Sequence, residues 1–274
     1  MTTQAEKAEK FQALHRSDDI LVLPNAYDAV SACVIAAEGF EAIATTSGGC
    51  AFSVGYCDGE NMTRDQMAEI VGRICNAVDI PVSADMEAGY GKEPGAVAAT
   101  IAATIESGAV GINIEDGSKG GERVLIDFDL SVERIRAARK AIDDSGIPMV
   151  LNARTDAFMT GEDDPVAEAT RRANAYLESG ADCTFVIGVS DAGRIGQLAN
   201  GIDGPLNVLA GASSPSIAEL KALGVKRVTF GSGFAKAAMT LVQKGARELK
   251  ETGTYGWVEG AMGQPDIHRI LKGG

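Results

Sequence analysis

Residues 80–116 read IPVSADMEAGYGKEPGAVAATIAATIESGAVGINIED, and this stretch decides the fold prediction. It begins and ends with short, nearly continuous apolar runs at 80–85 and 109–116, which are typical of strands buried on both faces. Between these runs, residues 95–107 place apolar side chains three and four apart, as in a helix, and Gly108 follows where that helix should end. The stretch therefore predicts a strand–helix–strand unit with parallel strands.

The same alternation recurs along the rest of the chain. Further short apolar runs lie at 20–25, 41–47, 148–154, 182–188, 206–211 and 226–231. Helical spacing of apolar residues occurs at 27–38, 63–78, 131–144, 163–179, 191–200, 214–223 and 234–250. Eight β-then-α units in about 230 residues predict an α/β fold, a (β/α)8 TIM barrel. The alternative is a doubly wound open sheet, which usually has fewer strands, and no GxGxxG joins the first strand to its helix.

The two ends of the chain extend beyond the eight units. Residues 2–16 predict an extra N-terminal helix, and residues 254–271, with Trp257 and Pro265, predict a C-terminal helical extension. This extension is expected either to pack on a neighbouring subunit or to cover the bottom of its own barrel. We find no linker, repeat or low-complexity segment, so residues 1–274 are expected to form one barrel domain.

Composition excludes several classes of protein. The chain has 274 residues, is 45% hydrophobic and carries a formal net charge of −13, which disfavours binding to nucleic acid or to anionic lipid. Five cysteines without a CxxC pair indicate free thiols in a reducing compartment. The polar N-terminus lacks a signal-peptide pattern, and no run of about 18 apolar residues predicts a membrane span. We therefore expect a cytoplasmic protein.

Acidic side chains gather where the predicted strands end, which is where barrel enzymes place their catalytic residues. Strand alternation puts Asp85 and Glu87 on one face, Glu115 ends the following strand, and Asp58 is nearby. Such carboxylates cannot all stay ionised without a cation among them, and Mg²⁺ prefers oxygen ligands. The alternative is that these carboxylates cap helices or pair with basic side chains.

Other candidates lie at the same predicted rim. Arg154 can bind a carboxylate with its planar guanidinium, or it can form a salt bridge to Glu115 or Asp156. The run Ser47-Gly48-Gly49 can aim backbone N–H groups at an oxyanion, or it can be a simple tight turn. Tyr90, between two glycines, can contact a substrate.

Other chemistries find little support in the sequence. The only histidines, His15 and His268, lie at the two extremities, so Ser-His-Asp, Cys-His and His-ligated zinc sites are disfavoured. Lys226 starts its strand, at the bottom of the barrel, which argues against a Schiff-base aldolase. Residues 231–233, Gly-Ser-Gly, follow the last strand and predict either a phosphate site or a plain turn.

These motifs resemble the isocitrate lyase/phosphoenolpyruvate mutase superfamily over roughly residues 20–235. The likeness is carried by PNAYDAVSA at 24–32, GFEAIATTSGG at 39–49, the Asp58-Gly59 turn, PVSADMEAGYG at 81–91, AVGINIED at 109–116 and LNARTDAF at 151–158. The resemblance implies a TIM-barrel enzyme that uses Mg²⁺, with Mn²⁺ as the alternative. It also implies a homo-oligomer, a dimer or tetramer that exchanges a C-terminal helix.

The resemblance also implies roles for individual residues. Asp85 matches the direct Mg²⁺ ligand, and its water-mediated partners match Asp58, Glu87 and Glu115. The backbone cradle for the carboxylate and 2-oxo group of the substrate matches Ser47, Gly48 and Gly49. Arg154 matches the arginine that grips the substrate and stabilises an enolate.

This chain departs from the superfamily pattern after the fourth predicted strand. The Lys-Lys/Arg-Cys-Gly-His loop of isocitrate-lyase-type members is replaced by DGSKGGER at 116–123, which has neither cysteine nor histidine. The phosphonate enzymes carry a lysine and an asparagine here, and only Lys119 can stand in for that pair. Glu87 also replaces a more usual aspartate. The sequence thus argues against cleavage of isocitrate or methylisocitrate.

From these features we expect a lyase or hydrolase that cleaves a C–C or C–P bond of a small 2-oxo acid. The enolate left by cleavage would be stabilised by the cation, Arg154 and the amides of Gly48 and Gly49. Decarboxylation of the oxaloacetate type needs no dedicated base, which suits a loop without cysteine. Ser190, Asn207 and Ser213 are expected to shape the pocket for the rest of the substrate. The alternatives are a phosphonopyruvate hydrolase or phosphonomutase, a non-catalytic 2-oxo acid binding protein, and a sugar-phosphate enzyme.

Overall fold

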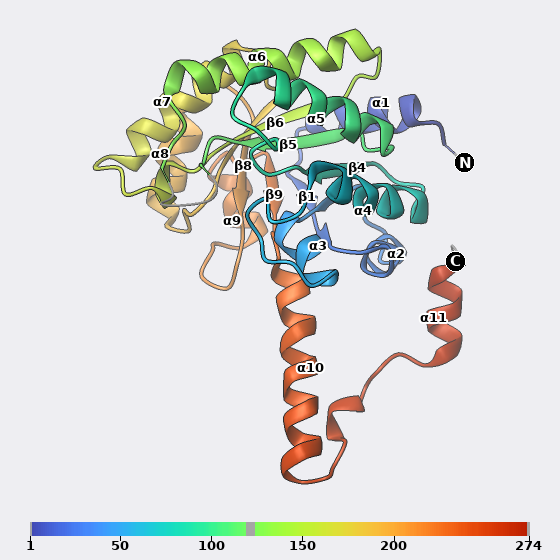
Figure 1. Cartoon of the computed structure of the whole chain (residues 1–274). Coiled ribbons are helices and arrows are strands. Elements are labelled where there is room, and N and C mark those ends of the chain that lie inside the picture. Colours follow the sequence, from blue (N-terminus) through green and yellow to red (C-terminus); the bar gives the residue numbers. More distant parts are fainter. Residues whose placement is uncertain (1, 119–123, 273–274) are drawn as a thin grey trace.

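The computed structural model of the chain describes residues 2–118 and 124–272 (Figure 1). Its strands form one parallel sheet in the order β1-β9-β8-β7-β6-β5-β4-β3-β2. The central strands are β4 (Val82–Asp85), β5 (Gly111–Glu115), β6 (Val150–Thr155), β7 (Cys183–Val186) and β8 (Leu206–Leu209). Every apolar run identified in the sequence overlaps one of the strands or, for the first run, two.

Proline explains why nine strands build an eight-stranded barrel. The first predicted strand is split at Pro24 into β1 (Leu21–Leu23) and β2 (Asn25–Ala26). A proline has no N–H to donate to a ladder, although its carbonyl still accepts from Ala44 N at 3.0 Å. β1 pairs with β9 (Arg227–Thr229), whereas β2 pairs with β3 (Ile43–Thr45). The two halves of one strand thus join the two ends of the sheet, and the predicted TIM barrel is confirmed.

Each helix predicted from the sequence is present, and one short helix after β3 was not predicted. The predicted helices are α2 (Ala29–Ala37), α4 (Arg64–Ala77), α5 (Pro94–Glu106), α6 (Phe128–Ser145), α7 (Pro165–Glu178), α8 (Ala192–Gly201), α9 (Ile217–Ala222) and α10 (Gly233–Glu251). Thr63 and Gln66 form a capping box at the start of α4. α6 begins earlier than expected, because Asp127 caps it by accepting from Leu130 N, so Ser131 lies inside the helix. Gly146 ends α6 with a φ of 73°.

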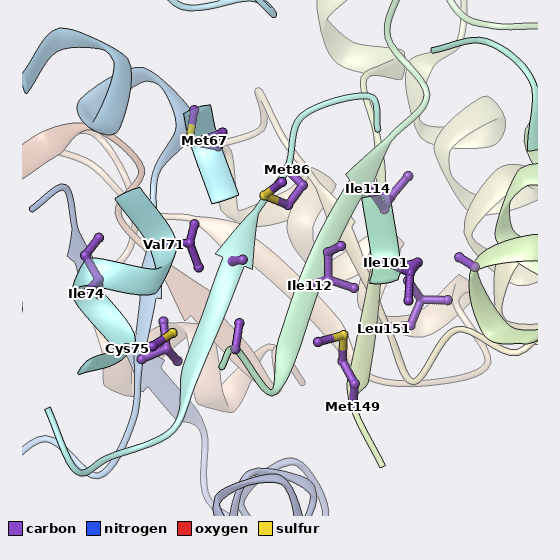
Figure 2. Packing of buried hydrophobic residues seen from close by; sticks show 14 of the residues in the cluster. Met67, Val71, Ile74, Cys75, Met86, Ile101, Ile112, Ile114, Met149 and Leu151 are labelled. Atoms are coloured by element: carbon purple, nitrogen blue, oxygen red, sulfur yellow. The ribbon is translucent and has the colours of Figure 1, made fainter. Parts of the chain in front are cut away.

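The hydrophobic core fills the space between the sheet and its helices (Figure 2). Met67, Val71 and Ile74 project from α4, and Ile101 projects from α5. They meet apolar residues of the central strands and the segments beside them, among them Met86, Ile112, Ile114 and Leu151. This packing holds the strand ends, and therefore the polar residues that follow them, in fixed positions.

The N-terminal helix closes the bottom of the barrel. α1 (Gln4–His15) buries Ala8 and Phe11 completely against a cluster that includes Leu21 and Val150. The expected extra helix is thus confirmed. Its position excludes one of the two expected places for the C-terminal extension, because the bottom of the barrel is already covered.

The C-terminal extension lies elsewhere. Figure 1 shows α10 projecting away from the barrel, after which the chain turns back through η2 (Gly256–Val258) to α11 (Gln264–Leu271). Trp257 packs against Gly245 of α10, and α11 packs against α2. Large apolar side chains stay exposed along α10 and the extension that follows it, namely Phe234, Met239, Leu241, Val242, Leu249, Tyr255, Trp257, Val258, Met262 and Leu271.

Gly111 lies where Phe11 of α1 packs against the barrel interior. A Cβ atom at this position would lie 2.5 Å from Phe11 Cε1 and 2.9 Å from Ser83 Oγ. Gly111→Ala is therefore expected to lower the free energy of unfolding by about 1–3 kcal/mol through overpacking. Urea denaturation measures this loss. Gly95→Ala is the control, because a Cβ there meets nothing within 4 Å; equal effects of the two substitutions would contradict the prediction.

Candidate active site

One cavity of about 320 Å³ opens at the carboxyl ends of the strands and descends into the barrel. Met159, Ser232 and Lys236 lie at its rim, and Arg227, which begins β9, lies at its floor. The polar residues that line it between rim and floor are Asn25, Thr45, Thr46, Ser47, Asp58, Ser83, Asp85, Asn113, Asn152, Arg154, Asn207 and Thr229. The cavity therefore joins most of the residues that the sequence singles out.

Asp85, the last residue of β4, is held by three hydrogen bonds. Its Oδ2 accepts from Ser47 N at 3.0 Å and from Ser47 Oγ at 2.8 Å, and its Oδ1 accepts from Asn113 Nδ2 at 3.2 Å. Asp85 is thus a fixed, partly exposed side chain at the wall of the cavity.

Ser47-Gly48-Gly49 does not form the expected turn. These residues begin a short helix, α3 (Ser47–Ser53), with Thr46 as its N-cap residue. The first N–H groups of a helix lack acceptors within the helix. The N–H of Ser47 donates to Asp85. The N–H groups of Gly48 and Gly49 follow it in the first turn. The absence of side chains is required here, because a Cβ on Gly49 would lie 2.7 Å from Tyr27 Cβ.

Asp58 approaches this first turn from a separate loop. A Cβ on Gly48 would lie 3.1 Å from Asp58 Oδ2 and 2.8 Å from Ser232 Oγ, so the three residues are close neighbours. Gly59, with a φ of 100°, allows the loop to turn back on itself. Asp58 and Asp85 are the two carboxylates that line the cavity.

Glu87 is not on the face expected from strand alternation. β4 ends at Asp85, and Glu87 has a φ of 51°, so the period of two does not apply to it. Its side chain is buried, and its Oε2 accepts from Glu60 N at 2.7 Å, while Glu60 Oε1 accepts from Tyr90 N at 2.8 Å. Glu87 thus connects the loop that carries Asp58 to the end of β4.

Glu115 and Arg154 form a buried ion pair. Arg154 Nη1 lies 2.5 Å from Glu115 Oε2, and Arg154 Nε lies 2.7 Å from Asp156 Oδ1. Both salt bridges considered from the sequence are therefore present, and Arg154 still lines the cavity. Burial would lower the pKa of Arg154, but Glu115, Asp156 and Asp85 together raise it. The guanidinium is charged at every ordinary pH.

The four acids do not meet at one point. Within residues 2–118 and 124–272, no three acidic, histidine or cysteine side chains are arranged so that they could hold one ion. Glu87 and Glu115 stand outside the cavity lining, whereas Asp58 and Asp85 belong to it. The fold thus divides the four predicted acids into a pair that lines the cavity and a buried pair that does not.

Tyr90 and the serines of the later loops lie away from the cavity. Tyr90 has a φ of 55°, and its ring packs against the core. Ser190 and Ser213 line a separate surface hollow near α8 and α9. Lys119 lies outside the described residues. Ser232, by contrast, belongs to the cavity and shares a hydrogen bond of 2.8 Å with Thr46 Oγ1.

Asparagines line the deeper part of the cavity. Asn152 Nδ2 donates to Asn113 Oδ1 at 3.0 Å, which extends the chain of hydrogen bonds from Asp85 downwards. Asn207 is fully buried beside Arg227. Arg227 and Lys236 are cavity residues that the sequence analysis did not single out. Alternation could have identified Arg227, because it lies two residues before Thr229 on one strand and so shares its inward face.

Comparisons with known proteins identify the family of the chain. The family model for phosphoenolpyruvate phosphomutase matches residues 11–250.

The chain belongs to the phosphoenolpyruvate phosphomutase family.

Three solved structures show the similarity in detail. A candidate lyase/mutase from Burkholderia cenocepacia J2315 is 40% identical, with a TM-score of 0.92 over 97% of this chain and 95% of that chain. A 2,3-dimethylmalate lyase of the PEP mutase/isocitrate lyase superfamily is 31% identical, with a TM-score of 0.86 over 98% and 95%. An oxaloacetate acetylhydrolase bound to its product oxalate is 26% identical, with a TM-score of 0.88 over 99% and 95%.

Family membership establishes the general class of the protein. It is an enzyme of the isocitrate lyase/PEP mutase superfamily, a lyase or mutase that acts on small carboxylic acids by breaking C–C or C–P bonds. The resemblance inferred from the sequence motifs is thereby confirmed. No helix in the described part of the chain is long and apolar enough to cross a membrane.

Proposed function

We propose that this enzyme is a Mg²⁺-dependent lyase or hydrolase that cleaves a C–C bond of a small 2-oxo acid, in the manner of an oxaloacetate decarboxylase or hydrolase. One observation carries the proposal: Asp85, Asp58 and Arg154 line a single cavity beside the first turn of α3. Carboxylates and an arginine in one cavity suit a substrate that binds a cation and is itself an anion.

The donor set fits a hard divalent cation. Mg²⁺ requires one or two protein carboxylates and keeps several waters. Asp85 would hold it directly, Asp58 would act through water, and both face the cavity. In this proposal Glu87 positions the loop of Asp58, and Glu115 orients Arg154. The two buried carboxylates thus act through the residues that they position. When bound, the cation supplies Lewis-acid polarisation of the 2-oxo group.

The residues of the chain then perform the remaining tasks. In this proposal the N–H groups of Gly48 and Gly49, in the first turn of α3 beside the cavity residue Ser47, donate to an oxygen of the substrate, as in an oxyanion hole. Arg154 stabilises the negative charge that develops on the enolate when the C–C bond breaks. Glu115 and Asp156 hold this guanidinium in one orientation before the substrate arrives, so that no reorganisation is needed during the reaction.

A C–P bond is the second candidate for cleavage. The matching family model describes a phosphomutase, and a curated relative from Arabidopsis thaliana, a carboxyvinyl-carboxyphosphonate phosphorylmutase, is 29% identical over 89% of this chain. Lys236 at the rim of the cavity supplies a further positive charge that suits a phosphonate. Phosphonopyruvate is the compound that tests this candidate.

The exposed apolar extension supports a homo-oligomer. α10 and the segment after it expose residues such as Leu241, Val242 and Met262, which a monomer would leave in water. In this proposal the extension packs on a neighbouring subunit, in a dimer or tetramer. Sedimentation velocity would measure the state, and a monomer at micromolar concentration would contradict it.

An assay of pyruvate release from oxaloacetate tests the proposed reaction. We expect saturable release with Mg²⁺, and release at the blank rate after chelation with EDTA. A blank without enzyme is essential, because free Mg²⁺ itself accelerates this decarboxylation. Oxalate and acetate are measured in the same samples, so that hydrolysis is detected if it replaces decarboxylation. Binding of 2-oxo acids without turnover of oxaloacetate or phosphonopyruvate would identify a binding protein instead.

A further inference from the structure

The floor of the cavity holds a buried arginine that the proposed reaction does not use. Arg227 is 2% exposed and lines the cavity from the first position of β9. Its Nη2 donates to Ser83 Oγ at 3.2 Å, and its Nη1 lies 3.2 Å from His15 Nε2. These two contacts leave most of the five N–H groups of the guanidinium without a partner.

The charge of Asp85 acts on this arginine, but no carboxylate is paired with it among the described residues. The hydrogen-bond partners of Arg227 are a serine and a histidine. His15 Nδ1 lies 2.9 Å from the Phe11 carbonyl, so it carries the proton and leaves Nε2 as an acceptor. Burial lowers the pKa of His15 to about 3, and burial lowers that of Arg227 to about 10. At neutral pH a charged arginine therefore faces a neutral imidazole.

Two donors at this level of the barrel lack acceptors. Arg227 Nε and Asn207 Nδ2 are both buried and have no hydrogen-bond partner among the described residues. Asn207 and Arg227 are paired in register on β8 and β9, so their side chains lie next to each other on the inner face. Buried donors and unpaired buried charges are costly, so each one in a native protein calls for an explanation, such as a bound ion, a ligand or a catalytic role.

From this arrangement we infer that Arg227 and Asn207 form a second anion subsite, at the floor of the cavity, which binds a carboxylate of the substrate remote from Arg154. The inference rests on the proposed function and narrows it: the substrate is a 2-oxo dicarboxylic acid with a short carbon chain. A monocarboxylic acid would leave the arginine without an anion.

The spacing along β4 suits such a substrate. Ser83, which accepts from Arg227, and Asp85, at the proposed cation site, are two residues apart and both line the cavity. Two residues of strand span about 6–7 Å. A short diacid can bridge this distance, with its 2-oxo end beside Asp85 and Arg154 and its other end beside Arg227.

Ligand binding with and without Arg227 tests the subsite. Dissociation constants are measured by calorimetry at fixed Mg²⁺ for 2-oxoglutarate, a diacid that does not decarboxylate spontaneously, and for 2-oxobutyrate, a monoacid. We expect the wild-type protein to bind the diacid at least about 10-fold more tightly. Arg227→Met should abolish this preference and leave the affinity for the monoacid unchanged. Asn207→Leu should reduce the preference. This variant replaces Arg227→Met as the test of the subsite if Arg227→Met does not fold.

Thermal unfolding without ligand gives an independent readout. Replacing an unpaired buried charge by an apolar side chain of similar length should raise the Tm by a few degrees, ~2–4 °C, if the arginine is kept for binding. A lower Tm, together with an unchanged diacid preference, would assign Arg227 a structural role and overturn the inference. Chloride that stabilises the wild type but not Arg227→Met, with no diacid preference, would show a site for an inorganic anion only and would also overturn it.

The binding experiment separates this inference from the proposed reaction. A diacid preference that depends on Arg227, in a protein that turns over neither oxaloacetate nor phosphonopyruvate, supports the subsite and rejects the reaction. Mg²⁺-dependent turnover with equal affinity for diacid and monoacid supports the reaction and rejects the subsite.

Discussion

Arg154→Ala is expected to reduce kcat/KM for oxaloacetate by about 10²–10³-fold, as the loss of one oxyanion-stabilising donor does in other enzymes. The guanidinium lines the cavity, and two carboxylates, Glu115 and Asp156, hold it in place. The charge that it stabilises exists only after the bond begins to break. The loss should therefore fall mainly on kcat, with a smaller rise in KM from weaker binding of the substrate.

The same substitution is expected to destabilise the fold. Arg154 is 2.5 Å from Glu115 and 2.7 Å from Asp156, and both carboxylates are buried. Removing one partner of a buried ion pair typically costs about 3–5 kcal/mol. Arg73→Ala is the matched control: Arg73 pairs with Glu69 at 2.6 Å, but its side chain is 68% exposed, so its loss should cost about 0.5 kcal/mol or less.

Arg154→Lys separates the two effects. Lysine keeps the positive charge between Glu115 and Asp156 but lacks the planar fork that contacts both. We expect it to recover most of the stability in urea denaturation and little of the kcat. A lysine variant with nearly wild-type kcat would show that charge alone is sufficient, and it would contradict the orientation role proposed for Glu115 and Asp156.

The strands and most helices could be predicted from the sequence because their signals are local. A parallel strand buried on both faces is apolar throughout, and glycines such as Gly108 and Gly146 end the preceding helices with positive φ values. The split of the first strand at Pro24 is also local in origin. The closing of the barrel follows from the number of strand–helix units.

The arrangement of the site depends on tertiary contacts that the sequence does not display. Ser47-Gly48-Gly49 has the composition of a turn, yet the segment is helical, and the backbone N–H and hydroxyl of its first residue, Ser47, donate to Asp85 from the neighbouring strand β4. Glu87 lies after the strand ends, and its left-handed conformation directs it towards Glu60 instead of the cavity. Strand alternation gives correct faces only while the strand continues, as it does for Asn152 and Arg154.

Asp85→Asn is expected to abolish Mg²⁺-dependent turnover, with a loss of at least about 10³-fold in kcat/KM, because the proposed direct ligand loses its charge. The fold should be affected much less. The asparagine fills the same volume and can still accept from Ser47, although its Nδ2 then faces Asn113 Nδ2, which now donates to Asp85 Oδ1. One mismatched pair of this kind costs about 1–3 kcal/mol.

Asp58→Asn provides the graded comparison that makes this prediction specific. Asp58 lines the cavity and is proposed to reach the cation through water, so its substitution should raise the Mg²⁺ concentration needed for half-maximal rate and leave the maximal rate within about 10-fold. Rates measured across a Mg²⁺ titration distinguish the two variants. If excess Mg²⁺ restored Asp85→Asn but not Asp58→Asn, the two carboxylates would exchange roles, with Asp58 as the direct ligand and Asp85 as the residue that positions α3.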